Sequence, residues 1–192
     1  MKKILGFLLV VVLLASCGGS RGDSAKSKSD VIKASELISR KEAEKLLGKP
    51  MEDRVLNVRR AFSDENRYVS DEYNFSIVII QESLHDKTKE VESNMLKDGW
   101  MKHMDLMKEA YYMTYPVIDL GIADSASFLY NTKGTCMWTL HVFYGEYYIS
   151  VMISDVAPDC KDTAEKIAWK QAKLKEAASM AVERLKTILK KR

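Results

Sequence analysis

Alternation of apolar and polar residues is clearest in the third quarter of the chain, where it predicts three antiparallel strands. Residues 126–130 alternate in the first strand, and residues 131–134 supply a turn. Strands at 136–144 and 147–155 then flank Gly145-Glu146, which fits a two-residue hairpin loop. The three strands together predict a meander.

The hairpin register divides its side chains between two faces. The face expected to line the core carries the cross-strand pairs Tyr144–Tyr147, Val142–Ile149, Leu140–Val151 and Trp138–Ile153. The opposite face carries Thr139, His141, Phe143, Tyr148, Ser150 and Met152. This second set is too apolar to be fully exposed to solvent, so we expect another part of the protein or a partner to cover part of it.

A further strand is predicted from Tyr68 to Gln81. The apolar run at 77–80 is typical of a strand that is buried on both faces. The stretch from Glu52 to Asn66 has no clear period, and a strand through Val55 to Val58 is left open.

Helices are predicted at both ends of this strand region. Ser39 and Glu42 form a capping box that begins a helix, which Gly48 and Pro50 end. A last helix is capped by Asp162, and its apolar stripe is Ala164, Ile167, Ala168, Gln171, Leu174, Ala178, Ala181, Val182, Leu185 and Leu189. Two more helical pieces are expected at 83–95 and 100–111. The fold class is therefore α+β, an antiparallel sheet with a C-terminal three-strand meander packed by helices that include a long C-terminal one.

Composition places the chain among ordinary globular proteins. It has 192 residues, of which 46% are hydrophobic and 30% charged, so one domain is expected. A net charge of +3 gives no electrostatic case for nucleic acid as a partner. Three cysteines are too few for a disulfide scaffold.

The first seventeen residues carry the most specific pattern. Two lysines precede the apolar run Ile4 to Leu14, which is too short to span a bilayer. Leu14-Ala15-Ser16-Cys17 then resembles the lipobox of bacterial lipoproteins, in which the cysteine is lipidated and becomes the first residue. This resemblance implies a signal peptide at 1–16 and a lipid anchor on Cys17. It also implies an outer-membrane location facing the periplasm, because Gly18 stands where an aspartate would signal inner-membrane retention.

The residues after Cys17 suggest a spacer. The segment 17–30 is rich in Gly and Ser and has no large apolar residue beyond the cysteine, so we expect a flexible tether. The single α+β domain is then expected over 31–192. Residues 37–48, the run Gly121-Ile122-Ala123-Asp124-Ser125-Ala126 and the terminal helix resemble small bacterial lipoproteins with a PsbP-like α/β/α fold. Members of that family mostly lack an assigned activity, so no catalytic residues are implied.

Candidate chemistry is sparse. The chain has no Gly-x-Ser-x-Gly, His-Glu-x-x-His, Cys-x-x-Cys, P-loop or dinucleotide motif. Cys136 and His141 lie five residues apart on one strand, which places them on opposite faces about 16 Å apart, too far for a catalytic dyad. Asp119, Asp124 and Asp155 lie near strand ends, where acids usually cap turns, and we assign them no role.

Sulfur-containing residues offer two further hypotheses. Met101, Met104 and Met107, with His103 between them, could bind Cu(I) through soft thioethers, although two of these methionines fall on a predicted apolar stripe where packing is the commoner use. Cys136 and Cys160 are predicted to form a disulfide, since they are the two thiols left once Cys17 is acylated and the expected envelope location permits oxidation. The alternative for this pair is two buried free thiols.

We therefore expect a lipid-anchored cell-envelope protein with a non-catalytic binding or structural role. Its expected partners are the membrane, through the anchor, and an envelope protein, and no cofactor is expected. The alternatives are a Cu(I)-binding lipoprotein that uses the methionines, and an enzyme whose site is assembled from residues distant in the sequence.

Overall fold

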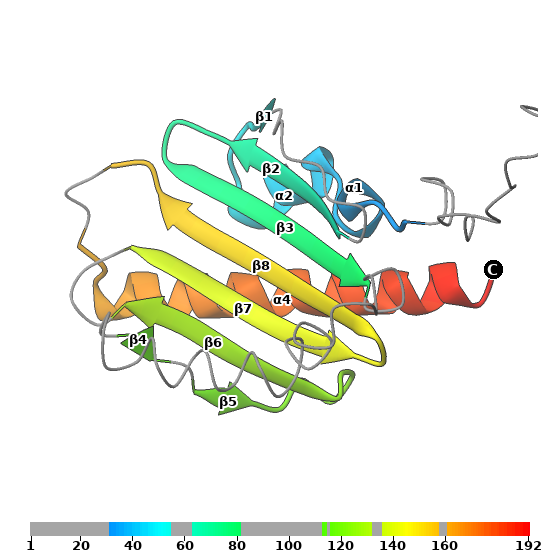
Figure 1. The fold of residues 1–192 in the computed structure, drawn as a ribbon. Coiled ribbons are helices and arrows are strands. Elements are labelled where there is room, and N and C mark those ends of the chain that lie inside the picture. The colour runs from blue at the N-terminus through cyan, green and yellow to red at the C-terminus, as the bar shows by residue number, and fades with distance from the viewer. Residues whose placement is uncertain (1–30, 55–62, 82–112, 115, 132–135, 158–160) are drawn as a thin grey trace, which may run out of the picture.

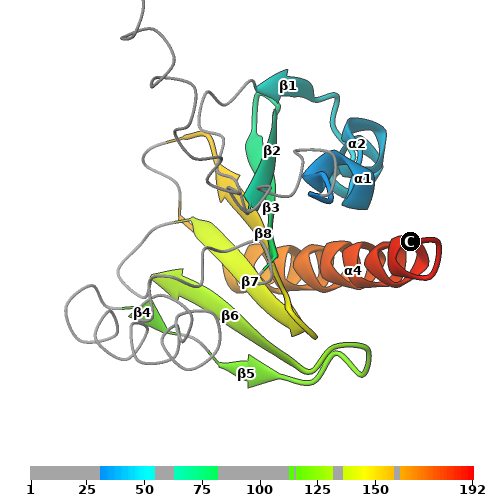
Figure 2. The same cartoon turned by 45° about the vertical axis from the view of Figure 1, so that its right-hand side comes forward.

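One antiparallel sheet organises the part of the chain that the computed structural model describes, which is residues 31–54, 63–81, 113–114, 116–131, 136–157 and 161–192. Its strands are β1 (Glu52–Arg54), β2 (Ser63–Val69), β3 (Tyr73–Gln81), β4 (Met113–Thr114), β5 (Val117–Ile118), β6 (Ser125–Asn131), β7 (Met137–Tyr144) and β8 (Tyr147–Asp155). Seven of them follow the order β1-β2-β3-β8-β7-β6-β4, and β5 pairs with β6 (Figure 1). The helices α1 (Ala34–Leu37), α2 (Arg40–Leu47) and α4 (Ala164–Leu189) pack on one face of this sheet (Figure 2). The predicted α+β class is confirmed.

The meander and its register are also confirmed. β6, β7 and β8 are neighbours in the sheet, and the four predicted cross-strand pairs from Tyr144–Tyr147 to Trp138–Ile153 are all present. Seven of these eight side chains are buried, and Tyr144 is half-buried. On the opposite face, the side chains of Thr139, His141, Phe143 and Tyr148 are buried as well. Ser150 and Met152 are half-buried, so part of that face is shielded from water, as its apolar content led us to expect.

The prediction of one strand from Tyr68 to Gln81 is wrong. Tyr68 belongs to β2, and a turn at 70–72 separates β2 from β3. The hydroxyl oxygen of Ser70 holds this turn by accepting hydrogen bonds from the backbone N–H groups of Glu72 and Tyr73. A polar side chain that satisfies two backbone donors favours a turn over a continuous strand.

β2 is polar even on the face that it turns toward the helices, which is why its pattern gives no strand signal. Asp64 accepts a hydrogen bond from the backbone N–H of Ala34 at 2.8 Å and so holds the start of α1. The Tyr68 hydroxyl donates to the carbonyl oxygen of Ile38 at 2.8 Å and accepts from the Asn66 amide at 3.0 Å. These side chains satisfy backbone groups of the helical layer, a role that hydropathy does not reveal.

The first predicted helix is confirmed as α2. Ser39 and Glu42 form its capping box, and Gly48 ends it in the left-handed conformation with φ of 68°. Glu42 also accepts two hydrogen bonds from the guanidinium of Arg184 on α4, at 2.6 and 3.0 Å. These bonds and those from Ser39 lower the pKa of Glu42 to about 2, against the opposing effect of its partial burial. The same carboxylate therefore caps α2 and ties it to α4.

The long C-terminal helix is present as α4, but its beginning differs from the prediction. Thr163, not Asp162, is the N-cap, and its hydroxyl accepts from the backbone N–H of Lys166 at 3.2 Å. Ala164 and Ala168 are exposed, whereas Lys170 is completely buried on the inward stripe. Asp162 is not available as a cap because its two carboxylate oxygens bind Lys170 and Trp138.

Several predicted elements lie outside the described residues. These are the signal peptide, the tether, the open strand at 55–58 and the two helical pieces at 83–95 and 100–111. Within the described ranges, no helix combines the length and the apolar content needed to cross a membrane.

Candidate functional site

The most concentrated polar chemistry among the described residues lies where α4 begins, beside the ends of β7 and β8. Lys170, which has no exposed surface, donates hydrogen bonds to Asp162 Oδ1 at 2.7 Å and to the carbonyl oxygen of Cys136 at 2.6 Å. It also lies 3.3 Å from Asp155 Oδ2, which Lys166 reaches at 2.8 Å. We call these four charged side chains, Asp155, Asp162, Lys166 and Lys170, the Lys170 cluster.

Each member of the Lys170 cluster is positioned by a different part of the fold. Asp155 ends β8, Asp162 precedes α4, and the two lysines stand one turn apart on α4. The indole N–H of Trp138 donates to Asp162 Oδ2 at 2.9 Å, and the ring of Trp138 stacks on Tyr130 with centroids 4.0 Å apart. The aromatic pair thus fixes the carboxylate that neutralises Lys170.

Burial makes the balance of charge in this cluster important. The side chains of Asp155 and Asp162 are 3% and 10% exposed, so neither carboxylate is well solvated. Removing a charge from water costs several kcal/mol per ion, and good hydrogen-bond geometry only offsets that cost. One carboxylate oxygen, Oδ1 of Asp155, is buried without a hydrogen-bond partner. Both lysines are therefore needed to offset the burial of the two carboxylates.

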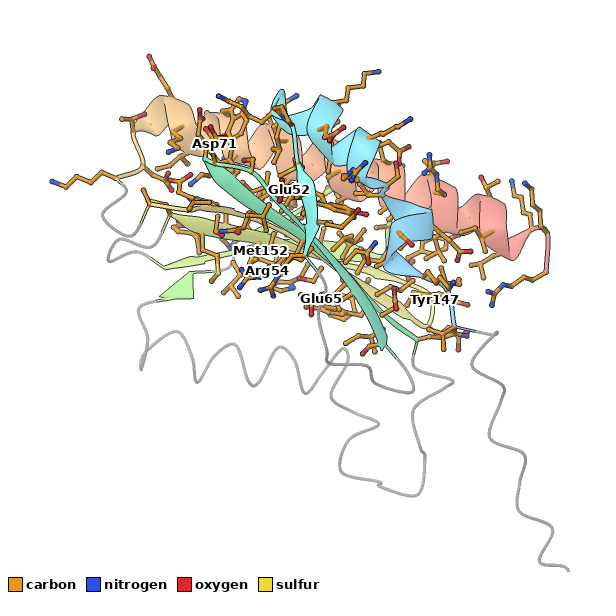
Figure 3. The ribbon with its side chains drawn as sticks, turned by 90° about the horizontal axis from the view of Figure 1, so that it is seen from above. Glu52, Arg54, Glu65, Asp71, Tyr147 and Met152 are labelled. Atoms are coloured by element: carbon orange, nitrogen blue, oxygen red, sulfur yellow. The ribbon has the colours of Figure 1, made fainter. Side chains whose placement is uncertain are left out.

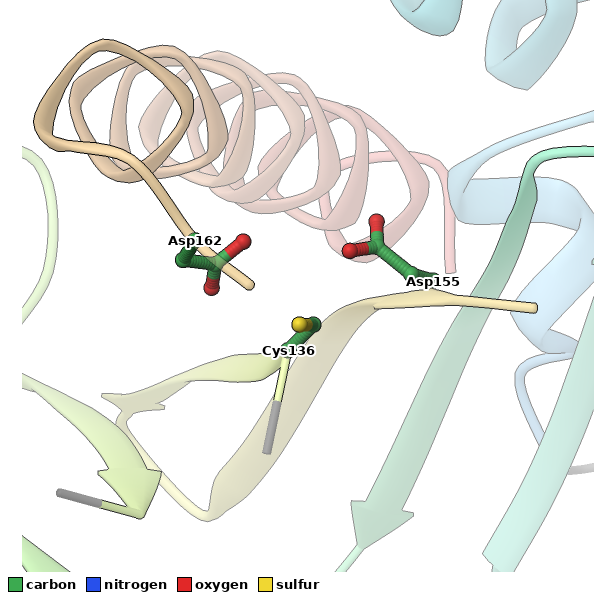
Figure 4. A group of neighbouring side chains, drawn as sticks. All are labelled: Cys136, Asp155 and Asp162. Atoms are coloured by element: carbon green, nitrogen blue, oxygen red, sulfur yellow. The ribbon is translucent and has the colours of Figure 1, made fainter. Parts of the chain in front are cut away.

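Three members of this region have the spacing of a metal site. One ligand atom each from Cys136, Asp155 and Asp162 lies within 4.8 Å of the others, and the three side chains converge below the start of α4 (Figure 4). However, the metal-binding form of cysteine is the thiolate, and Cys136 is disulfide-bonded. The ammonium group of Lys170 also lies between the two carboxylates and supplies the positive charge that a cation would bring. We interpret the group as an ion network.

The disulfide hypothesis is only partly addressed by this geometry. Cys136 is disulfide-bonded and buried, in agreement with its half of the prediction. Cys160 lies outside the described residues, so its pairing with Cys136 stays a prediction. The backbone carbonyl of Cys136 accepts the hydrogen bond from Lys170, which links the cysteine backbone to the ion network.

A second polar group lies on the opposite face of the sheet. The rings of His141 on β7 and Tyr148 on β8 stack with centroids 5.6 Å apart, and the Tyr148 hydroxyl is hydrogen-bonded to His141 Nδ1. In Figure 3, Met152 and Glu65 mark this face, which is turned away from α4. Burial lowers the pKa of His141 to about 3 and raises the pKa of Tyr148, so both side chains are neutral near pH 7. A neutral, buried pair of this kind packs the sheet and carries no charge for catalysis.

The buried His141 predicts a pH dependence of stability. Its folded pKa of about 3 lies below the ordinary value of 6.5, so below pH 6.5 the unfolded chain takes up a proton that the folded chain does not. Stability is therefore lost as the pH falls from 6.5 toward 3, by about 2 kcal/mol at pH 5 relative to pH 7. Urea unfolding of the wild type and of His141→Gln at both pH values measures this loss.

The control for this experiment is His85→Gln/His103→Gln, which removes the other two histidines. We expect the control to keep the wild-type difference between pH 7 and pH 5 and His141→Gln to lose most of it. A His141→Gln variant that loses as much stability at pH 5 as the wild type would show that another group causes the pH dependence.

The remaining sequence-based candidates have mixed outcomes. Asp119 accepts from the backbone N–H of Gly121 and Asp124 from that of Gly145, both at 2.7 Å, so both acids hold turns as expected. Asp155 differs because it pairs with two lysines. Cys17 and the candidate copper ligands Met101, His103, Met104 and Met107 lie outside the described residues.

Lys170 is the residue that sequence reasoning missed. A signal for it is present, because Lys170 precedes Leu174 by four residues and Ala177 by seven, and so lies on the same helix face as both. A buried lysine on an apolar stripe needs an acid as a partner, but the acids nearest to Lys170 in the sequence are Glu165 and Glu176, so the sequence does not identify Asp155 and Asp162 as its partners. A lysine at such a position either extends its long side chain to water or forms a buried ion pair, and the tertiary structure decides which of the two occurs.

Comparisons with known proteins give no family for this chain. No protein-family model, no curated protein and no solved structure matches it.

Proposed function

We propose that this chain is a lipid-anchored cell-envelope protein whose folded domain acts by binding or as a structural part rather than by catalysis. The observation that carries the proposal is the lipobox Leu14-Ala15-Ser16-Cys17 behind a charged and then apolar leader. Gly18 favours the outer membrane, with the domain facing the periplasm.

The arrangement of the chain supports the anchor. Fourteen residues, 17–30, separate the first described residue from the apolar leader, and they include no large apolar side chain apart from Cys17. The described core begins at Ile32 and draws on α1, α2, the sheet and α4. A spacer between a lipid and an independent core is the organisation that an anchored domain needs.

The chemistry of the described residues supports a binding or structural role. Lys170 is held between two carboxylates, Glu42 is held by Arg184, and His141 is neutral and buried. Catalytic acids and bases are instead tuned to exchange a proton near the working pH and must reach a substrate. We also propose kinship with the small bacterial lipoproteins of PsbP-like fold, on the sequence pattern at 37–48, at 121–126 and in the terminal helix.

Replacing Cys17 tests the anchor. Cys17→Ser should abolish incorporation of an alkyl fatty-acid probe, because the thiol is the site of acylation, and should lower the membrane-bound fraction of the protein. The acyl chains contribute about 0.8 kcal/mol per buried CH₂, enough to hold the domain on a membrane when several chains are present. In-gel detection of the probe and fractionation of cells measure both effects.

The matched control is Cys136→Ser/Cys160→Ser, which keeps Cys17 and should label like the wild type. If Cys17→Ser labels as strongly as the wild type and still fractionates with membranes, the proposed anchor is wrong.

A further inference from the structure

Charge is segregated between the helical layer and the rest of the domain. Segments 31–49 and 163–192, which contain the three described helices, carry fourteen basic and six acidic residues. Residues 50–162 carry eleven basic and nineteen acidic residues. The two parts therefore have net charges of +8 and −8, although the domain as a whole is neutral. Four of these bases, Arg40, Lys49, Lys166 and Lys170, pair with acids of the other part, so the separation at the surface is smaller than these totals. The remaining separation creates a surface potential that a neutral net charge conceals.

Three acids of the helical layer are paired with bases of the same layer. Glu42 is bound by Arg184, Glu176 by Lys173 and Glu183 by Lys186, each within 3.1 Å. By contrast, Lys41, Lys45, Lys190 and Lys191 are exposed and form no ion pair with another described residue.

These four lysines lie at the end of the layer where the domain joins the tether. α1 follows directly after residue 31, and the last turns of α4 run beside α1 and α2 (Figures 1 and 2). Arg184 and Glu42 connect α4 to α2 at this end. We call α1, α2 and residues 183–192 the basic end.

The length of the tether limits how far this end can move from the lipid. Fourteen residues span at most about 50 Å even when fully extended. If Cys17 is acylated, the tether enters the domain at residue 31, so the basic end lies beside the point of attachment and within reach of the membrane. Basic residues next to a membrane attachment are attracted to anionic lipids by about 1 kcal/mol each.

We infer that the basic end rests on the anionic phospholipid headgroups of the membrane that holds Cys17. This inference deepens the proposed function and depends on the lipid anchor. Contact through the helical layer places the sheet on the side of the domain that is turned away from the membrane. The attraction is electrostatic and is therefore sensitive to salt, because exposed charges are screened over about 10 Å at 0.1 M ionic strength.

The test uses the full lipidated chain, extracted from membranes and reconstituted into vesicles. One set of vesicles contains phosphatidylcholine only, and the other also contains phosphatidylglycerol. A fluorescent amino acid at Thr187, exposed on the last turn of α4, reports energy transfer to a headgroup-labelled lipid. The same probe at Val117, which is 68% exposed on β5, is the reference. Mass spectrometry of the reconstituted chain first establishes that Cys17 carries acyl groups.

We expect energy transfer from position 187, but not from position 117, to be higher in the anionic vesicles and to fall to the neutral-vesicle level at high salt. Lys190→Gln/Lys191→Gln should lower the ratio of docked to undocked domain about 25-fold, since each lysine contributes about fivefold. The matched control is Lys161→Gln/Lys175→Gln, which removes the same charge from two exposed lysines far from the basic end and should have little effect.

The two possible failures are distinguishable. The docking would be overturned if an acylated chain gave equal energy transfer from position 187 in neutral and anionic vesicles. It would also be overturned if the control variant lost as much energy transfer as Lys190→Gln/Lys191→Gln. Either result would leave the lipid anchor unaffected. A chain without acyl groups on Cys17 would overturn the anchor and, with it, the inference.

Discussion

Replacing Lys170 with methionine is expected to lower the free energy of unfolding by about 3 kcal/mol, because removal of one partner leaves a buried charge without compensation. Lys170 has no exposed surface, and its ammonium group is the cation nearest Asp162, at 2.7 Å. The loss should lie at the lower end of the range for buried pairs because Asp155 keeps Lys166 at 2.8 Å. Urea unfolding at pH 7 measures the change.

The matched control is Lys173→Met, one turn further along α4. Lys173 is 28% exposed and, among the described residues, pairs with Glu176 on the same helix, so its replacement should cost less than about 1 kcal/mol. A second variant, Lys170→Met/Asp162→Asn, removes the orphaned charge but keeps an acceptor for Trp138 and should recover part of the loss. Equal effects of Lys170→Met and Lys173→Met would show that the buried ion network contributes nothing specific.

Removing the disulfide with Cys136→Ser/Cys160→Ser is expected to lower the free energy of unfolding by about 3 to 4 kcal/mol. That figure follows from the chain entropy of a closed loop of about 25 residues and is an upper value because native-state strain subtracts from it. The structure shows that Cys136 is disulfide-bonded, whereas Cys160 as its partner is predicted. Thermal and urea unfolding with and without reductant measure the effect.

Reductant serves as the internal control for this prediction. It should destabilise the wild type by a similar amount and leave Cys136→Ser/Cys160→Ser unchanged. Intact mass after alkylation of the unfolded, unreduced protein reads the pairing directly. If Cys160→Ser alone leaves Cys136 inaccessible to alkylation, the pairing with Cys160 is wrong.

The parts of the fold that sequence predicts well are those in which one simple period determines burial. In β7 and β8 every second side chain enters the core. The two-residue Gly145-Glu146 loop allows a single pairing register, so the cross-strand pairs follow directly from the sequence. The capping box of α2 and Gly48 are equally local, since each satisfies backbone groups within a few residues.

The parts of the fold that the sequence pattern does not predict use polar side chains in buried positions. β2 turns Asp64 and Tyr68 toward the helices to bond backbone groups of α1 and Ile38, which removes the apolar alternation that identifies a strand. Asp162 resembles an N-cap, but Lys170 and Trp138 bind it instead. In each case the partner is distant in the sequence, and residue type at one position does not reveal it.

The state of the chain at Cys17 tests the central claim most directly. The protein is purified from bacterial membranes with detergent and digested, and the N-terminal peptide is identified by mass spectrometry. We predict that the mature chain begins at Cys17 and that this cysteine carries acyl groups. A mature chain that begins elsewhere, or a Cys17 with an unmodified thiol, would contradict the lipid-anchored account.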